Sequence, residues 1–439
     1  MEMGLGRTDY GTTLPDSLKA GRITIRQLDD AVRPILETKI RLGLFEHPYV
    51  DEAQAKDVLN DPDHRAEAMH SAERSAVLLR NQGGLLPLQA ARYKSIAVLG
   101  PLADSNKDTI GSWVSANDAG ETVTVLQALE RQAGSETHVE YAPGVQIART
   151  FPSPFDGTLM VKKQAAWSEG QAAEEFAKAV QIAQRSDISV MVLGEAQNMS
   201  GESASRSSLE LPGKQQQLLE AVVATGKPVT LVLLNGRPLN ISWAAEHVPA
   251  ILEAWYPGEF GGRAIAETLF GDNNPGGKLT ITFPRNVGQL PDFYNADPSR
   301  VRKYVDDDGK PLFPFGYGLS YSSFAYARLT AQARSTGVDG DVAVTVDVTN
   351  SGDRAGDEVA QLYMRQDTSS VETPERSLKG FERIHLMPHE TKTVHFSIPM
   401  RELEIWNAQD KWVVEPGKYT LWAGGSSQAD LTTSFQIKQ

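Results

Sequence analysis

Cysteine is absent from this sequence of 439 residues. Its absence excludes disulfide bridges, zinc–thiolate sites and thiol nucleophiles, and it leaves the redox compartment undetermined. Long apolar runs are absent as well, because no stretch approaches the roughly 20 residues of a membrane span. The N-terminal residues lack the basic-then-apolar pattern of a signal peptide, so nothing in them directs export.

Positive charge is also scarce. Lys and Arg total 43 against 56 Asp and Glu, which gives a net charge of -13. This balance disfavours nucleic acid and anionic membranes as partners, and a neutral substrate fits better. The chain is 40% hydrophobic and 23% charged, ordinary globular usage, and it is long enough for two or three domains.

The segment 23–45 predicts one long helix. Thr24 and Gln27 have the spacing of a capping box, and Pro34 should kink the helix. Apolar residues recur at helical spacing at Leu28, Val32, Ile35, Leu36 and Ile40. Such a stripe needs a surface to pack on, and the residues before it supply none. We therefore expect the chain to begin partway through a domain; the alternative is a helix that docks on the next domain.

The middle of the chain alternates between helix and strand patterns. Residues 62–80 predict a further helix. Short β-branched apolar runs predict strands at 94–100, 187–194, 228–236 and 250–258. Helical patterns lie at 122–132, 171–186, 213–225 and 261–270. This alternation predicts an α/β domain, a mostly parallel sheet covered by helices on both faces.

From residue 326 onward the pattern changes to strict alternation. Val342, Val344, Val346 and Val348 fall on one face of a strand, and turn-rich segments separate further alternating runs. We predict an antiparallel β-sandwich of immunoglobulin-like size over 326–439.

Polar and aromatic side chains follow the predicted strands of the α/β domain. In open α/β sheets, ligands bind beyond the carboxyl ends of the strands. We expect one rim to gather Asp104, Glu195, Asn235, Arg237, Trp255 and Glu259. For each of them taken singly, a structural role in a turn is the alternative.

Several motifs together resemble glycoside hydrolase family three, in its bacterial periplasmic β-glucosidase branch. The motifs are "SAERSAVLLRNQGGLLPL", "KSIAVLGPLAD", "GEAQNMSGESASRSSLELPGKQQQLL", "GKPVTLVLLNGRPL", "ILEAWYPGEFGGRAIAETLFGDNNPGGKLTITFP", "PLFPFGYGLSY" and "LKGFERIHLMPHET". They occur in the family's order. The resemblance implies a (β/α)8 barrel, an α/β sandwich and a fibronectin type III-like domain, of which this chain is the C-terminal portion without most of the barrel.

The resemblance also implies domain boundaries. We expect five segments: the end of the barrel at 1–48, a linker and helix at 49–92, the α/β sandwich at 93–285, a connection at 286–325 and the fibronectin-like domain at 326–439.

Hydrolysis in this family retains anomeric configuration and uses two carboxylates. The resemblance implies a barrel aspartate as nucleophile, in a Ser-Asp-Trp context, and a glutamate of the α/β domain as acid/base. No Ser-Asp-Trp occurs in this sequence, and "MEMG" matches family sequence just beyond the nucleophile. We expect the chain to supply only the acid/base domain and to be inactive by itself.

Two glutamates compete for the acid/base role. "SGESASR" resembles the family's "SGE" followed by Arg, which assigns the role to Glu202. A general acid must reach a sugar bound on the barrel, which favours a carboxylate on a pliable loop. Glu195, the second choice, follows a strand directly and is expected to accept backbone hydrogen bonds. Arg206 orients the loop or a ligand hydroxyl, or forms a surface ion pair, and Trp113 stacks on a sugar or fills an interdomain seam.

Other sites are not predicted. His385 and His389 flank a strand-to-turn sequence, which does not suit a metal pair, and no G-x-G-x-x-G supports a dinucleotide. We expect no metal and no cofactor. The predicted partners are a β-linked glucoside or oligosaccharide and the missing barrel as a separate chain, with a homo-oligomer left open, in the periplasm or outside the cell. The rival interpretation is a non-catalytic module that binds carbohydrate or protein.

Overall fold

The computed structural model describes residues 9–114, 119–149, 151, 165–297, 303–334 and 340–438. The chain divides into two compact units, Met1–Ala66 and Glu67–Gln439. None of the described helices combines the length and the apolar character needed to cross a membrane.

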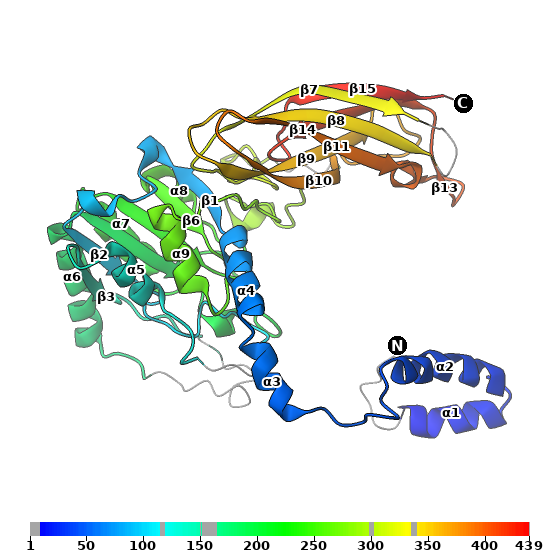
Figure 1. Ribbon diagram of the computed structural model, residues 1–439, viewed down its shortest axis with the longest axis horizontal. Coiled ribbons are helices and arrows are strands. Elements are labelled where there is room, and N and C mark those ends of the chain that lie inside the picture. The colour runs from blue at the N-terminus through cyan, green and yellow to red at the C-terminus, as the bar shows by residue number, and fades with distance from the viewer. Residues whose placement is uncertain are drawn as a thin grey trace. The chain divides into compact units, whose positions relative to one another are not determined.

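The first unit is helical (Figure 1). It holds α1 (Asp9–Lys19), α2 (Ile25–Arg41), α3 (Glu52–Leu59) and the start of α4 (Pro62–Ser75). The Gln27 backbone N–H donates to Thr24 Oγ1 at 3.2 Å and the Gln27 side chain accepts from the Thr24 N–H, so the predicted capping box is confirmed. α1 lies in a stretch for which we predict no element.

α2 is shorter than the predicted helix 23–45. Gly43 has a φ of 66°, a left-handed conformation that ends a helix readily, and Pro34 lies inside α2. Its apolar stripe is uncovered in the described part of the chain, because Val32, Ile35, Leu36 and Ile40 are between 41% and 60% exposed.

The second unit begins with a six-stranded sheet. Its strands are β1 (Val77–Asn81), β2 (Ser95–Leu99), β3 (His138–Ala142), β4 (Ile188–Gly194), β5 (Val229–Leu234) and β6 (Ala250–Glu253). They lie in the order β1-β6-β5-β4-β2-β3, and all pairs are parallel except that of β1 with β6. The predicted parallel α/β architecture is confirmed.

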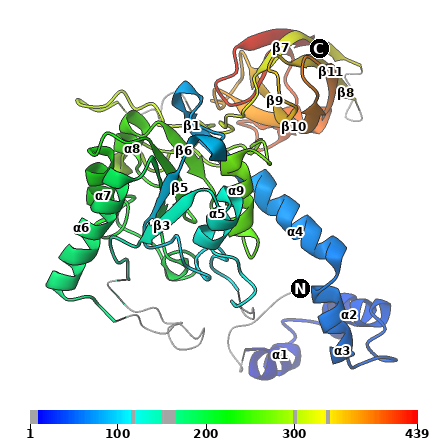
Figure 2. The ribbon, with the colours of Figure 1, turned by 60° about the vertical axis from the view of Figure 1, so that its left-hand side comes forward.

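Helices cover both faces of this sheet (Figure 2). They are α5 (Val125–Ala133), α6 (Glu169–Arg185), α7 (Gln215–Val223), α8 (Ser242–His247) and α9 (Gly261–Phe270). One hydrophobic cluster joins the sheet to α6, α7 and α8, and a second joins its other face to α5 and α9. Because both faces are buried, the four central strands read as continuous apolar runs.

The prediction of helix through residue 80 is wrong. α4 ends at Ser75, and Val77, Leu78 and Leu79 form an edge strand in which all three side chains are buried. A helix would bury one side of such a run, whereas a covered strand buries every residue. β3 and α8 were not predicted either, because β3 mixes polar with apolar residues and α8 is a short helix.

A β-sandwich follows, as predicted. One sheet has the order β10-β9-β14-β15 and the other β11-β8-β7, with a small β12-β13 hairpin. The strands are β7 (Phe324–Ala333), β8 (Asp341–Asn350), β9 (Gly356–Gln366), β10 (Ser377–Leu386), β11 (Thr391–Pro399), β12 (Ile405–Trp406), β13 (Trp412–Val413), β14 (Gly417–Gly424) and β15 (Leu431–Ile437). The four valines of β8 enter the core of the sandwich, as their alternation predicts.

Candidate functional site

The strand order places the predicted rim. β2, β4, β5 and β6 are consecutive neighbours and run parallel, so their carboxyl ends meet at one edge of the sheet. The segments after these strands carry the predicted rim residues, and the prediction that they share one edge is confirmed. This edge is the place where an open α/β sheet binds its ligands.

Glu195 begins the loop after β4 and is fully buried. Its Oε1 accepts a hydrogen bond from Arg206 Nη1 at 2.8 Å, and its Oε2 accepts one from Arg237 Nε at 3.2 Å. The expectation of backbone donors is wrong among the described residues, because these two guanidinium groups occupy the carboxylate. Glu195 thus faces into the protein.

Arg206 turns back toward the strand end. Besides its bond to Glu195, it donates from Nη2 to the Glu210 carbonyl at 2.7 Å, and its side chain is only 18% exposed. Both contacts lie within the loop that follows β4. The geometry therefore favours loop orientation over contact with a ligand or an exposed ion pair.

Glu202 lies farther along the same loop and is exposed. The φ angle is 97° at Gly201 and 57° at Ser203, so the chain turns sharply on both sides of the glutamate. The structure gives the Glu202 carboxylate no hydrogen bond or ion pair within the described residues. A carboxylate in this position is free to meet a molecule that approaches from outside.

Trp113 borders this loop. A Cβ built on Gly201 would lie 3.3 Å from Trp113 Nε1, so the indole is close to the Glu202 turn. Trp113 is 72% exposed and has a φ of 69°, which is uncommon for a bulky residue. Within the described chain its ring does not fill a seam.

Asp104 and Trp255, two of the other rim residues, have structural roles. Asp104 Oδ1 accepts from Thr124 Oγ1 at 3.1 Å, beside the N-terminus of α5. Trp255 packs edge-on against Phe283 in the core, at 5.9 Å between ring centroids. For these residues the alternative of a structural turn role is the better description.

Glu253, the last residue of β6, was missed because it lies in an apolar run. It is fully buried and accepts hydrogen bonds from Asn235 Nδ2 at 3.0 Å and from the Trp255 N–H at 2.9 Å. Burial raises its pKa to about 8, although these two hydrogen bonds act in the opposite direction. At about pH 7 this carboxyl group is therefore mostly protonated.

Glu253→Gln is expected to flatten the pH dependence of stability. The unfolded chain releases this proton near the ordinary value of 4.5, whereas the folded chain keeps it up to about 8. Between these values the folded state binds more protons, so this group lowers the free energy of unfolding as the pH rises. Denaturant unfolding at about pH 5 and 8 would measure the slope. The control Glu130→Gln, at an exposed position, should keep the pH dependence of the parent chain. If the free energy of unfolding changes with pH equally in both variants, the expectation is refuted.

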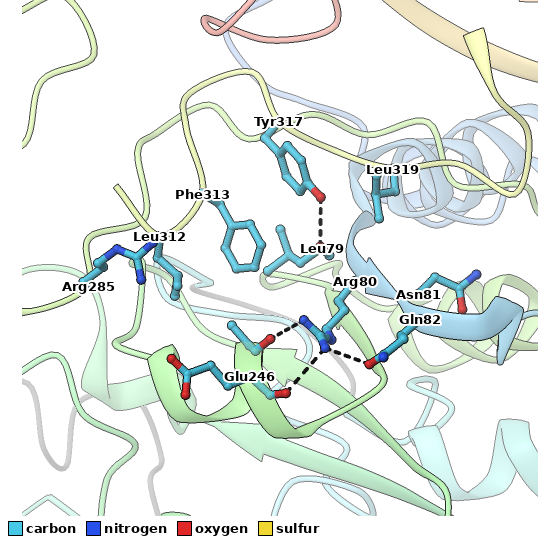
Figure 3. A pocket seen from close by; sticks show the side chains of 11 residues that line it. Leu79, Arg80, Asn81, Gln82, Glu246, Arg285, Leu312, Phe313, Tyr317 and Leu319 are labelled. Atoms are coloured by element: carbon cyan, nitrogen blue, oxygen red, sulfur yellow. Dashed lines mark hydrogen bonds between the residues drawn. The ribbon is translucent and has the colours of Figure 1, made fainter. Parts of the chain in front are cut away.

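A hollow of about 590 Å³ lies at the opposite edge of the sheet (Figure 3). β1 runs antiparallel to β6, so its last residue, Asn81, pairs with the first residue of β6. The end of β1, which lines the hollow, therefore lies beside the amino end of β6 and not beside its carboxyl end. The Arg80 guanidinium donates to Gln82 Oε1 at 2.8 Å and to the carbonyls of Ala245 and Glu246 in α8. Because this hollow lies away from the strand ends that carry Glu202, it is not the candidate site.

Comparison with known proteins adds two domain matches. Residues 76–321 match the glycosyl hydrolase family 3 C-terminal domain, and residues 358–427 match the fibronectin type III-like domain. A periplasmic beta-glucosidase of Salmonella typhimurium is 39% identical over 100% of this chain and 59% of its own length. A beta-xylosidase of Formosa agariphila is also 39% identical, over 98% of this chain and 58% of its own length.

A solved structure is also similar to this chain. The beta-glucosidase of Listeria innocua in complex with glucose is 33% identical and superposes with a TM-score of 0.83, over 96% of this chain and 56% of that chain. This chain therefore spans less than two thirds of each of these relatives.

Proposed function

Since this chain belongs to glycosyl hydrolase family 3, we propose that it supplies the acid/base domain of a retaining β-glucosidase. The substrates proposed are β-glucosides and short β-glucans, in keeping with the beta-glucosidases among its relatives. The periplasmic relative also supports a periplasmic location, which fractionation of cells that produce the full protein would test.

Retaining hydrolysis needs two carboxylates on opposite sides of the glycosidic bond, roughly 5 Å apart. The family resemblance implies that an aspartate of the barrel is the nucleophile. In this proposal Glu202 first protonates the leaving oxygen and then removes a proton from the water that attacks the glycosyl-enzyme. Its neighbours Ser200, Gly201 and Ser203 are small and leave room for a sugar.

One observation carries the assignment. Of the two loop glutamates, Glu202 is exposed and has no partner in the described structure, whereas Glu195 is fully buried between Arg206 and Arg237. An acid that transfers a proton to a substrate must reach it directly or through one water molecule. The exposure of Glu202 supports this role, whereas the burial of Glu195 between two arginines argues against it for that residue.

The proposal predicts that residues 1–439 alone do not hydrolyse an aryl β-glucoside, because the covalent route needs the barrel's nucleophile. The same chain joined to a family barrel that carries the aspartate should be active. We propose that the uncovered apolar face of α2 packs on that barrel. Release of nitrophenol from both proteins is the measurement. Turnover by the 439-residue chain alone would contradict the proposal that the nucleophile lies on the barrel. Glucose binding by this chain without any turnover of the joined protein would favour the rival non-catalytic interpretation.

Trp113 is proposed to stack on the sugar or aglycone beyond the cleaved bond, because its exposed ring borders the Glu202 turn. Trp113→Ala in the barrel-containing protein is expected to raise KM for cellobiose about tenfold, the loss of roughly 1.4 kcal/mol of binding. The KM for methyl β-glucoside, which has almost no aglycone, serves as the control. An equal change in both values would contradict the stacking role.

A further inference from the structure

The turn that carries Glu202 is closed at its base by Arg237. This arginine lies just after β5, and its Nη2 donates to the Met199 carbonyl at 2.6 Å and to the Ala204 carbonyl at 2.8 Å. One guanidinium group thus joins the residue before the Ser200–Ser203 segment to the residue after it. The distance across the turn is fixed by these two hydrogen bonds.

A second arginine repeats the arrangement. Arg149 lies in the segment that follows β3, and it donates to the Asn198 carbonyl at 2.8 Å and to the Ser203 carbonyl at 3.1 Å. These two acceptors also lie on either side of Glu202. Both arginines bind main-chain oxygens, so neither competes for the Glu202 carboxylate.

Arg237 is itself held from two directions. Its Nε donates to the buried Glu195 carboxylate, and its own carbonyl accepts from Asn235 Nδ2 at 2.9 Å. Glu195 also provides the negative charge that offsets this mostly buried guanidinium, whose side chain is 21% exposed. The group that closes the turn is therefore built on the ends of two buried strands.

We propose that Arg237 is a positioning residue that sets the location of Glu202, with Arg149 as a second bridge and Glu195 as the anchor of Arg237. The inference rests on the proposed function of Glu202. The described structure gives the Glu202 side chain no hydrogen bond or ion pair, so the main chain of the turn sets the point from which this side chain extends. The turn also holds Ser203 at a φ of 57°, which is unfavourable for that residue unless the surroundings enforce it.

The first test measures main-chain opening in the 439-residue chain. Arg237→Gln is expected to speed amide hydrogen exchange in peptides covering 196–206 by about tenfold or more. The matched control is Arg185→Gln, which removes an exposed arginine–glutamate pair between α6 and β3 and should leave these peptides unchanged. Unchanged exchange in Arg237→Gln would overturn the proposal. If this variant does not fold, Arg149→Gln, which leaves the Glu195 cluster intact, replaces it.

The second test is kinetic and uses the barrel-containing protein. A misplacement of about 1 Å costs up to roughly 10²-fold in rate. Arg237→Gln should therefore lower kcat 10- to 100-fold for glucosides with poor leaving groups, with smaller losses for activated aryl glucosides and little change in KM. Arg237→Lys, which keeps the charge beside Glu195, should restore part of kcat. A uniform loss for all leaving groups would indicate a merely structural role and overturn the proposal.

The two tests separate this inference from the proposed function. If Arg237→Gln opens the turn but Glu202→Gln has no leaving-group dependence, the proposed acid is wrong and the inference falls with it. If Glu202→Gln has the dependence but Arg237→Gln leaves both exchange and kcat unchanged, the proposed acid stands and the positioning role is wrong.

Discussion

In the barrel-containing protein, Glu202→Gln is expected to slow cellobiose hydrolysis by roughly 10²- to 10⁴-fold, the usual contribution of a general acid or base. An aryl glucoside with a strongly activated leaving group needs little protonation, so its cleavage should slow far less. Hydrolysis of the glycosyl-enzyme still needs the general base. Added azide should therefore restore turnover of the activated substrate in Glu202→Ala, because azide attacks without losing a proton.

The buried glutamate provides the comparison. Glu195→Gln should show no rescue by azide, since Glu195 faces Arg206 and Arg237 and does not face the substrate. The measurements are kcat and KM for a series of aryl glucosides of graded leaving-group pKa. If Glu202→Ala hydrolyses cellobiose normally while Glu195→Ala is inactive, the assignment of the two residues must be exchanged.

The second large effect concerns stability. Glu195→Ala is expected to lower the free energy of unfolding by about 3 kcal/mol, because it leaves two mostly buried guanidinium groups without a counter-charge. Denaturant unfolding of the 439-residue chain measures this loss.

Glu140→Ala is the matched control for Glu195→Ala. It removes the partly exposed partner of Arg185, in a pair that solvent reaches, and should cost less than about 1 kcal/mol. Losses of similar size in the two variants would contradict the role assigned to the buried cluster.

The sequence predicts those parts of the fold that depend on neighbouring residues. Each of the central strands is a continuous apolar run, and its carboxyl end is marked by the turn or polar residue that follows, which is enough to place Glu195 and Asn235 on one rim. The sequence does not predict β1, because Val77, Leu78 and Leu79 follow a helix almost directly and read as its continuation. Their pairing with β6 is what identifies them as a strand.

The support of the site depends on contacts that are distant in sequence. Arg149 reaches the Ser203 carbonyl across 54 positions, and Arg237 reaches Glu195 across 42. The position of Arg237 after a predicted strand puts it on the rim but does not indicate what it binds. Arg149 lies in no predicted motif, and arginines on loops are usually solvated. The family resemblance assigns the proposed acid, Glu202, from "SGE", whereas the contacts that hold its turn were found only in the structure.

The bridges from Arg149 and Arg237 end on carbonyl oxygens, and every amino acid supplies such an oxygen. The exposed side chain of Ser205 can thus be exchanged without removing any hydrogen bond that closes the turn. A library built at this position would vary the surface beside the proposed acid while the bridges that hold its turn remain. The proposed site would in this way allow selectivity to be changed separately from the chemistry, which is a favourable starting point for directed evolution.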